Sequence, residues 1–278
     1  MPMNEIPPLN AAAVLKRYGL RADKSLGQNF LQDPFALEAI ASAAEIKSTD
    51  TVLEIGPGLG SLTRYLAASA EQVIAVELDR KMIRPLQAVI ASYPNVRVLQ
   101  GNILELSPKA LIVEKDYLVV ANIPYYITSA VIRHLLESDL KPRRIVLTVQ
   151  KEVAERICAK PGDMSLLALS VQIYGKPNIV ARIPAQAFFP APNVDSAVLS
   201  VDIYPSPRIK LELLESFFKL IKAGFSQKRK TLRNSLSAGL HIAPIAAEEM
   251  LRNVNIDPMR RAETLSIEEW QALCEIKN

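Results

Sequence analysis

The chain has 278 residues, of which 49% are apolar and 22% are charged. This composition excludes a disordered chain, and the length exceeds the roughly 150 residues of a typical domain, so we expect one large domain and a smaller one. The net charge of +4 and the pI of about 9.0 favour an anionic partner.

The N-terminus and the two cysteines predict a cytoplasmic protein. Residues 1–10 lack the basic and apolar pattern of a secretory signal, and no apolar run approaches the ~20 residues that a membrane span requires. Cys158 and Cys274 have no paired-cysteine or histidine-rich neighbourhood, which argues against a zinc site and a disulfide framework. We therefore expect no metal and no membrane contact, and a protein that acts as a monomer.

The first 45 residues predict a short helical segment. Residues 10–19 are typical of a helix with Asn as its N-cap and Gly at its end. The stretch KSLGQNFL (24–31) interrupts the helical pattern. Asp33 and Pro34 then open a second helix that runs to about Glu45, with the aspartate as cap and the proline in the first turn.

Apolar strands alternate with helical patterns through the next hundred residues. The expected strands are 51–55, 73–77, 96–100, 117–122 and 144–149. Alternation at this spacing indicates βαβ units and a parallel sheet covered on both faces. A helical pair at 150–174 and two strands at the sheet edge, 178–183 and 194–203, are expected to follow. The fold class predicted is α/β, with a Rossmann-like sheet.

A change of composition marks the expected domain boundary. The segment YPSPRI (204–209) holds two prolines, so we place a Rossmann-like domain at 1–205 and a small all-helical domain at 206–278. The later helical patterns are 211–224, 228–240, 244–254 and 266–276. From 206 to 278 there are twelve Lys and Arg against nine Asp and Glu, so this segment carries +3 of the net charge.

A glycine loop joins the first strand of the sheet to the next helix. The stretch LEIGPGLGSLT (53–63) contains Gly56, Gly58 and Gly60. Glycines let the backbone approach a ligand, and the helix N-terminus offers unpaired N–H groups, although a tight turn alone would look similar. Ser61 stands where a dinucleotide fingerprint requires a third glycine, which favours an adenosine without a pyrophosphate.

Polar side chains follow the next two strands. Glu77 ends the second strand, 21 residues beyond Gly56, where a carboxylate can accept hydrogen bonds from both ribose hydroxyls. Asp79 is the competing carboxylate, and a solvated acid at a strand end is the plain alternative. Asn102 follows the third strand, and its amide either contacts an adenine ring or caps a turn; the sequence favours neither.

The stretch NIPYY (122–126) ends the fourth strand with an unusual combination of groups. An exocyclic amine such as adenine N6 is a poor nucleophile, and two acceptors off the base plane would direct its lone pair at an electrophile. Asn122 supplies one acceptor, and the backbone carbonyl of Ile123 the second, because Pro124 holds the residue before it extended. Tyr125 offers a ring on which a flipped base can stack. A strand end with core tyrosines is the alternative, which the neighbouring glycine loop disfavours.

The order of these motifs resembles that of a known family. The chain resembles the S-adenosylmethionine-dependent ribosomal RNA adenine N6,N6-dimethyltransferases, most closely the bacterial small-subunit branch, the KsgA/RsmA family. The likeness is carried by KSLGQNFL (24–31), LEIGPGLGSLT (53–63), VELD (76–79), NIPYYITS (122–129), QKEVAERI (150–157), FFPAPNVDSAV (188–198), FSQKRKTLRNSL (225–236) and RAETLS (261–266).

The resemblance implies a function and a set of site residues. It implies S-adenosylmethionine as methyl donor, no metal, and double methylation of two adjacent adenines in the 3′-terminal hairpin loop of small-subunit (16S) ribosomal RNA. The expected partner is the immature small ribosomal subunit, and the expected role is small-subunit biogenesis. The expected cofactor-binding residues are Asn29, Leu31, Gly56, Gly58, Gly60, Glu77, Asn102 and Asn122. Phe188 matches the aromatic that faces Tyr125 across the target base, and Asn102 replaces the usual Asp.

A basic run in the C-terminal segment is the expected RNA contact. Lys228, Arg229, Lys230 and Arg233 place four cations over six positions at an expected helix start. Such a run is usually a solvated face. Because RNA is the anionic partner that the other motifs predict, we expect these side chains to meet its phosphates.

Three other functions stay open. Resistance-type enzymes, which dimethylate one adenine of large-subunit RNA, share the QNFL and NIPY motifs, although RAETLS (261–266) and FFPAPNVDSAV (188–198) favour the small-subunit branch. An NAD-dependent oxidoreductase would share the sheet and Glu77, but Ser61 and NIPYY do not serve a hydride donor. The third is a ribosome-assembly factor for which binding matters more than catalysis.

Overall fold

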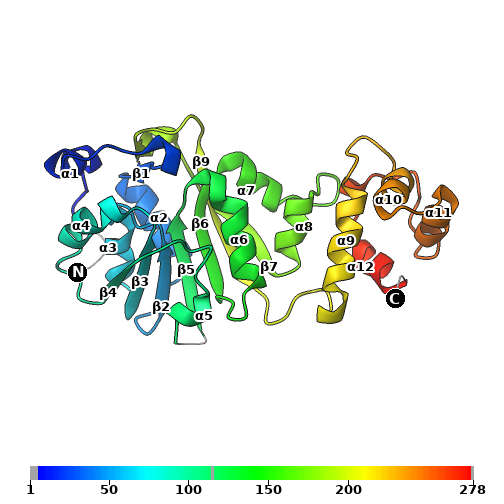
Figure 1. The fold of residues 1–278 in the computed structure, drawn as a ribbon, viewed down its shortest axis with the longest axis horizontal. Coiled ribbons are helices and arrows are strands. Elements are labelled where there is room, and N and C mark those ends of the chain that lie inside the picture. Colours follow the sequence, from blue (N-terminus) through cyan, green and yellow to red (C-terminus); the bar gives the residue numbers. More distant parts are fainter. Residues whose placement is uncertain (1–5, 114–115, 277–278) are drawn as a thin grey trace. The chain divides into compact units, whose positions relative to one another are not determined.

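The chain forms two compact units. The computed structural model describes residues 6–113 and 116–276, so residues 1–5 of the expected N-terminal segment and Lys277 lie outside the described residues (Figure 1). The first unit comprises Met1–Ala154 and Pro177–Ile203, and the second comprises Glu155–Lys176 and Tyr204–Asn278. The expected boundary near residue 205 would leave residues 155–176 in the first unit. They belong to the second unit, because the helix Leu166–Gln172 packs against the helix Leu214–Gly224.

The N-terminal segment follows its capping signals. Helix α1 (Ala11–Arg17) begins after Asn10, whose side chain accepts a hydrogen bond from Ala13 N. Helix α2 (Pro34–Ala43) begins after Asp33, whose side chain accepts from Ala36 N. Between them, the short strand β1 (Phe30–Leu31) pairs antiparallel with β8 (Phe188–Phe189), so Phe30 lies opposite Phe189 and Leu31 opposite Phe188. This pairing ties the N-terminal segment to a distant part of the chain.

A seven-stranded sheet forms the centre of the first unit among the described residues, in the order β4-β3-β2-β5-β6-β9-β7. The strands are β2 (Thr51–Ile55), β3 (Gln72–Glu77), β4 (Val96–Gln100), β5 (Tyr117–Asn122), β6 (Arg144–Gln150), β7 (Gly175–Ile183) and β9 (Ser196–Ile203). Strands β2 to β6 are parallel and β9 is antiparallel to β6. The strand order reverses between β2 and β5, which is where open α/β sheets bind ligands. The predicted α/β class is confirmed.

Helices cover both faces of this sheet. They are α3 (Ser61–Ala67), α4 (Arg80–Val89), α5 (Pro108–Leu111) and α6 (Thr128–Glu137), together with α2. Successive strand residues such as Val119 and Val120 point to opposite faces, and both are fully buried. Helices α2 and α3 pack on the face that carries Val52 and Val120, and α6 lies over the opposite face in Figure 1. This double cover explains the nearly continuous apolar runs of the strands.

The second unit is helical where it is described. It contains α8 (Leu166–Gln172), α9 (Leu214–Gly224), α10 (Leu232–Leu240), α11 (Pro244–Arg252) and α12 (Ile267–Ile276), and α7 (Lys151–Ile157) spans the change of unit. Trp270 and Phe217 are fully buried in this unit. The expected helix at 228–240 begins only at Leu232. Among the described residues, no helix is both long and apolar enough to cross a membrane.

Candidate functional site

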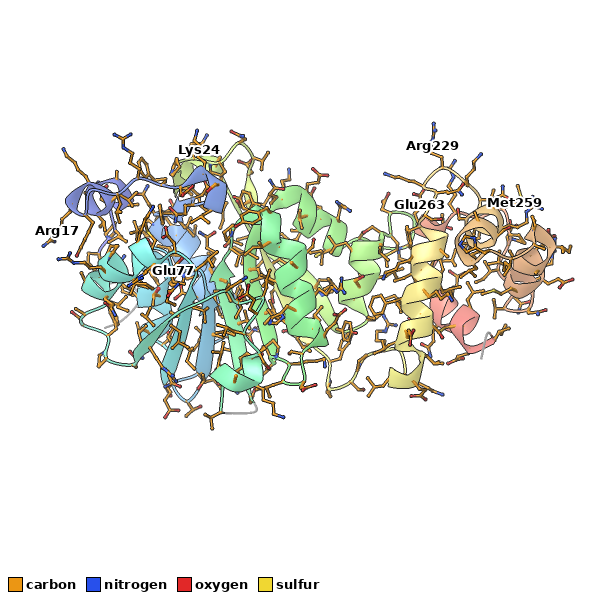
Figure 2. The ribbon with its side chains drawn as sticks, in the orientation of Figure 1. Arg17, Lys24, Glu77, Arg229, Met259 and Glu263 are labelled. Atoms are coloured by element: carbon orange, nitrogen blue, oxygen red, sulfur yellow. The ribbon has the colours of Figure 1, made fainter. Side chains whose placement is uncertain are left out.

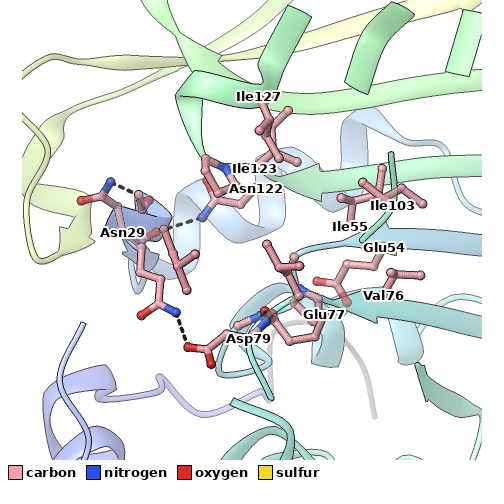
Figure 3. A pocket seen from close by; sticks show the side chains of 18 of the residues that line it. Asn29, Glu54, Ile55, Val76, Glu77, Asp79, Ile103, Asn122, Ile123 and Ile127 are labelled. Carbon is pink, nitrogen blue, oxygen red and sulfur yellow. Dashed lines mark hydrogen bonds between the residues drawn. The ribbon is translucent and has the colours of Figure 1, made fainter. Parts of the chain in front are cut away.

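A pocket opens at the carboxyl ends of the parallel strands (Figure 3), and its volume, which includes the open solvent at its mouth, is about 1040 Å³. Its lining comes from 26–31, 54–59, 61–62, 76–79, 101–103 and 122–127. These segments follow or precede β1, β2, β3, β4 and β5, which meet at the reversal of strand order. The pocket therefore collects in one place motifs that lie up to about 100 residues apart in sequence.

Most of the predicted cofactor-binding residues line this pocket. They are Asn29, Leu31, Gly56, Gly58, Glu77, Asn102 and Asn122. Gly60 is not among the lining residues: it caps α3 in the left-handed conformation, with φ of 84°. A Cβ at Gly60 would lie 2.9 Å from Leu86 Cδ1, so this glycine serves the packing of the loop against α4.

Glu77 holds the glycine loop in place. Its Oε2 accepts a hydrogen bond from Gly58 N at 2.9 Å, and its Oε1 accepts from Asp79 N at 2.8 Å. Burial raises the pKa of the Glu77 carboxyl, while the backbone donors oppose that shift. Each carboxylate oxygen has a second lone pair, so both can still accept from a ligand hydroxyl.

Asp79, the competing carboxylate, has a different set of partners. Its Oδ1 accepts from Lys81 N at 2.9 Å and so caps α4, and its Oδ2 accepts from Gln28 Nε2 at 2.9 Å. The Gln28 amide oxygen in turn accepts from Asp23 N. Gln28 was not singled out from the sequence, although it stands in the QNFL motif. It connects the N-terminal segment to the end of β3.

Glu54 is a second residue that sequence reasoning missed. It is the acid of the ExGxGxG pattern, only 1% exposed, and its carboxyl group lies among the pocket residues (Figure 3). Its Oε2 has no hydrogen-bond partner among the described residues. The pKa of Glu54 is raised to about 8, chiefly by burial. The Thr63 hydroxyl opposes this rise, and the nearby Glu77 charge adds to it. The pocket therefore holds a carboxyl group that a bound cation would ionise.

The raised pKa of Glu54 predicts a pH dependence of stability. Between pH ~4.5 and ~8 the folded protein binds a proton that the unfolded chain has released, so its stability falls as pH rises, by about 1.4 kcal/mol per pH unit at most. Glu54→Gln removes this group and should flatten the pH dependence of Tm between pH 5 and 8. Glu71→Gln, at an exposed position, is the control. Parallel curves for wild type and Glu54→Gln would contradict the prediction.

Asn122 is oriented by the backbone of the N-terminal segment. Its Nδ2 donates to the carbonyl oxygen of Asn29 at 3.1 Å, which leaves Oδ1 as an acceptor on the pocket side (Figure 3). Ile123 is buried and precedes Pro124, and both line the pocket. Asn122 and Ile123, which the sequence predicts to supply the two acceptors, therefore both belong to the pocket wall.

The tyrosines of NIPYY have different environments. Tyr125 lines the pocket, and its hydroxyl lies 2.6 Å from Ser196 Oγ on β9, which fixes the direction of the ring. Burial raises the pKa of the Tyr125 phenol. Tyr126 is 63% exposed and also touches the rim of the pocket.

Phe188 does not line the pocket, which differs from its expected place opposite Tyr125. Its side chain is 4% exposed and packs in the core cluster with Leu31 and α2 residues such as Leu37. Neighbouring residues of a strand point to opposite sides. Phe188 therefore points inward while Phe189 is 38% exposed.

Asn102 uses its amide to cap a turn. Its Oδ1 accepts from Leu104 N at 3.1 Å, and its Nδ2 donates to Glu105 Oε1 at 2.8 Å. Of the two alternatives that the sequence left open, the structure contains the turn cap. Asn102 still lines the pocket, beside Ile103.

The basic run lies in a turn and not on a helix. Lys228, Arg229 and Lys230 are exposed between α9 and α10, and they form no ion pair within the described part of the chain (Figure 2 shows Arg229 extending away from the ribbon). Arg233 lies on α10 and pairs with Glu248 at 3.2 Å. The expected helix start fails because Thr231 is extended, so α10 begins after it.

The described residues contain no cluster of three or more His, Cys, Asp or Glu side chains arranged to hold a metal ion. The polar groups of the pocket include the two buried carboxyl groups of Glu54 and Glu77, the oriented amide of Asn122, and further amide, hydroxyl and backbone groups. Such a set suits a cationic organic ligand with hydroxyl groups.

Comparison with known proteins shows the family to which the chain belongs. Residues 19–277 match the family described as Ribosomal RNA adenine dimethylase. A protein named Ribosomal RNA small subunit methyltransferase A from Dehalococcoides mccartyi (strain CBDB1) is 50% identical over 272 residues, covering 96% of this chain and 93% of that protein. The protein of the same name from Alkaliphilus metalliredigens (strain QYMF) is 40% identical over 275 residues, covering 96% of each.

Two solved structures of similar sequence have the same fold. A dimethyladenosine transferase from Plasmodium falciparum has a TM-score of 0.75 at 28% identity, over 88% of this chain and 95% of that chain. The 23S rRNA methyltransferase ErmE has a TM-score of 0.72 at 28% identity, over 89% of this chain and 98% of that chain. On the match over nearly its whole length, the chain belongs to the ribosomal RNA adenine dimethylase family.

Proposed function

We propose that the protein transfers methyl groups from S-adenosylmethionine to N6 of two adjacent adenines in the 3′-terminal hairpin loop of small-subunit (16S) ribosomal RNA, on the immature small subunit. In each transfer N6 gains a methyl group and releases one proton to water, and the donor leaves as a neutral thioether. The observation that carries the proposal is the orientation of Asn122. Its amide nitrogen is held by the Asn29 carbonyl, which turns the amide oxygen into a fixed acceptor in the pocket. Fixed acceptors are what an unreactive aromatic amine requires.

The residues of the pocket fit S-adenosylmethionine. Glu54 offers a buried carboxyl oxygen without a partner, which suits the positive charge of the donor. The Glu77 carboxylate lines the pocket and can accept hydrogen bonds from ribose hydroxyls. Gly56 and Gly58 have no side chains that would occupy the space of the adenosine. When bound, S-adenosylmethionine supplies an electrophilic methyl group on a positively charged sulfur.

The chain's own part in the transfer is to position the amine. Asn122 Oδ1 and the Ile123 carbonyl accept from the two N–H groups of N6, and the Tyr125 ring supports the base. After the first methyl transfer one N–H remains, so a slight rotation of the base must keep it on one acceptor. Rates on RNA with adenosine and with N6-methyladenosine at the target position test this step.

The choice of RNA follows from the relatives. The proteins that are 50% and 40% identical to this chain are named as small-subunit enzymes, while the large-subunit enzyme ErmE is 28% identical. The exposed side chains of Lys228, Arg229 and Lys230 are free to meet RNA phosphates. Arg233 contributes less, because Glu248 already neutralises it.

The deciding experiment measures transfer of labelled methyl groups from S-adenosylmethionine to undermethylated immature small subunits. Mature small subunits and large-subunit RNA are the parallel substrates, and Asn122→Ala is the control. Up to four methyl groups per small subunit on adenine N6, with none from the variant, would support the proposal. Label confined to large-subunit RNA would assign the protein to the resistance type, and tight subunit binding without label would make it an assembly factor.

A further inference from the structure

A second, open groove lies beside the catalytic pocket on the first unit. Its volume, which includes the open solvent above it, is about 870 Å³, and it is lined by Ala12, Leu15, Lys16, Gly19, Leu20, Arg21, Ala22, Phe189 and Pro190. The lining therefore comes from α1, from the segment that follows it and from the β8 turn. None of these residues has a role in the function proposed above.

The groove has an apolar floor and an exposed aromatic wall. Leu15 is almost fully buried below it, whereas Phe189 is 38% exposed at its side. A large exposed side chain beside a hollow of this size is a binding surface for a flat apolar group. Gly19 adds to the opening, because a Cβ at this position would meet no atom within 4 Å.

Positive charge surrounds the groove. Lys16 and Arg21 are exposed lining residues, and Arg17 and Lys24 stand next to them; Figure 2 shows the side chains of Arg17 and Lys24 extending outward. None of the four forms an ion pair within the residues that the structure describes. The nearby Asp23 carboxylate is engaged with Ser25, accepting from its N at 2.9 Å and its Oγ at 2.6 Å. The rim therefore has a net positive charge.

The groove and the catalytic pocket share a wall. Phe30 of β1 lines the catalytic pocket, and its strand partner Phe189 lines the groove. Opposite residues of an antiparallel pair point to the same face, so the Phe30 and Phe189 side chains lie next to each other on one face of the β1–β8 pair. Phe30 and Leu15 also belong to one buried cluster. The groove therefore lies next to the catalytic pocket, with the Phe30 side chain between them.

We propose that the groove binds a nucleotide of the substrate RNA next to the methylated adenine, with its base stacked on Phe189 and its phosphate near Lys16 and Arg21. This inference rests on the proposed function. Aromatic rings beside cations are the usual means by which proteins hold unpaired RNA bases. An apolar floor with a positive rim matches a base with its phosphate better than it matches a peptide or a lipid.

Two variants test the groove by independent means. Phe189→Ala removes the stacking ring, and Ala12→Leu fills the groove without changing a charge. Ala13→Leu, on the exposed side of the same helix, and Phe35→Ala, which removes a phenyl ring that is 81% exposed elsewhere, are the matched controls. Phe189→Trp keeps a ring and adds a fluorophore; the single natural tryptophan, Trp270, is fully buried.

The measurements are the Kd for a hairpin RNA with the target loop, and the KM for that RNA and for S-adenosylmethionine. We expect Phe189→Ala and Ala12→Leu to raise the Kd and KM for RNA by about 10-fold, within the ~5- to 150-fold range of one stacked base, with the KM for S-adenosylmethionine unchanged. The controls should bind RNA as wild type does. Phe189→Trp should keep wild-type affinity, and RNA should quench its added emission. Lys16→Gln with Arg21→Gln should reduce the slope of log K against log salt by about 1.4–1.8.

RNA affinity of Phe189→Ala and Ala12→Leu equal to wild type, with no quenching in Phe189→Trp, would overturn the groove proposal. A wild-type protein that self-associates through this surface, and becomes monomeric in Ala12→Leu, would assign the groove to a second copy and overturn it as well. These binding results do not depend on methyl transfer. A wild-type protein without transfer to small-subunit RNA would therefore overturn the proposed function alone.

Discussion

Asn122→Ala should lower kcat for methyl transfer to RNA by roughly 10²–10³-fold. The variant removes the only side-chain acceptor of the predicted pair and leaves the Ile123 carbonyl as the remaining group that can grip N6. It also removes the donor to the Asn29 carbonyl, whose bond of 3.1 Å fixes the amide in the wild type. Because the base still stacks on Tyr125, the KM for RNA should change much less than kcat.

The measurement is single-turnover transfer of labelled methyl groups at saturating RNA and S-adenosylmethionine. Asn102→Ala is the matched control, since this amide also lines the pocket but is engaged in capping a turn. It should retain most of the wild-type rate. An Asn122→Ala protein with more than a tenth of the wild-type rate would show that the amide is not the acceptor on which the transfer depends.

Glu77→Ala should weaken binding of S-adenosylmethionine by about 100-fold or more. Two effects act together: the ribose hydroxyls lose an ionised acceptor, at about 1.5–3 kcal/mol per hydrogen bond, and the Gly58 N–H loses its partner. The freed loop no longer holds the shape that the adenosine requires. We also expect the free energy of unfolding to fall by about 1–3 kcal/mol, because backbone donors are left unpaired.

Calorimetric titration with S-adenosylmethionine and thermal denaturation measure the two effects separately. Glu77→Gln keeps the volume of the side chain but has one acceptor oxygen, so its affinity should lie between wild type and Glu77→Ala. A lower Tm with an unchanged Kd in Glu77→Ala would assign Glu77 to the structure of the loop and would leave the ribose to another group.

The strands of the sheet and the motifs that line the pocket were predictable because strong local signals encode them. The strands at 51–55 and 117–122 match β2 and β5 as found, since a strand buried on both faces needs a continuous apolar run. The cap residues Asn10 and Asp33 also act as expected. The motifs come together because parallel strands all end at one edge of the sheet.

Other features depend on contacts between distant residues and were not predictable. Strand β1 has two residues and exists only because β8 pairs with it. The inward turn of Phe188 follows from that pairing, and so does the exposure of Phe189. Gln28 and Glu54 both stand inside motifs, but the bond of Gln28 to Asp79 and the burial of the Glu54 carboxyl depend on other segments, which their sequence neighbours do not indicate. The start of α10 depends on the extended Thr231, which the cationic run does not indicate.

The pairing of β1 with β8 also has a consequence for the order in which the pocket is completed during synthesis of the chain. The two strands are about 160 residues apart, and a chain is synthesised from its N-terminus. A nascent chain that has reached the end of β6 contains the glycine loop, Glu77 and Asn122, but not the strand that pairs with Phe30 and Leu31. Ligands stabilise only the state that binds them. A methyl donor is therefore expected to stabilise the first unit only after β8 has been synthesised, and not to assist the folding of the segments that precede it.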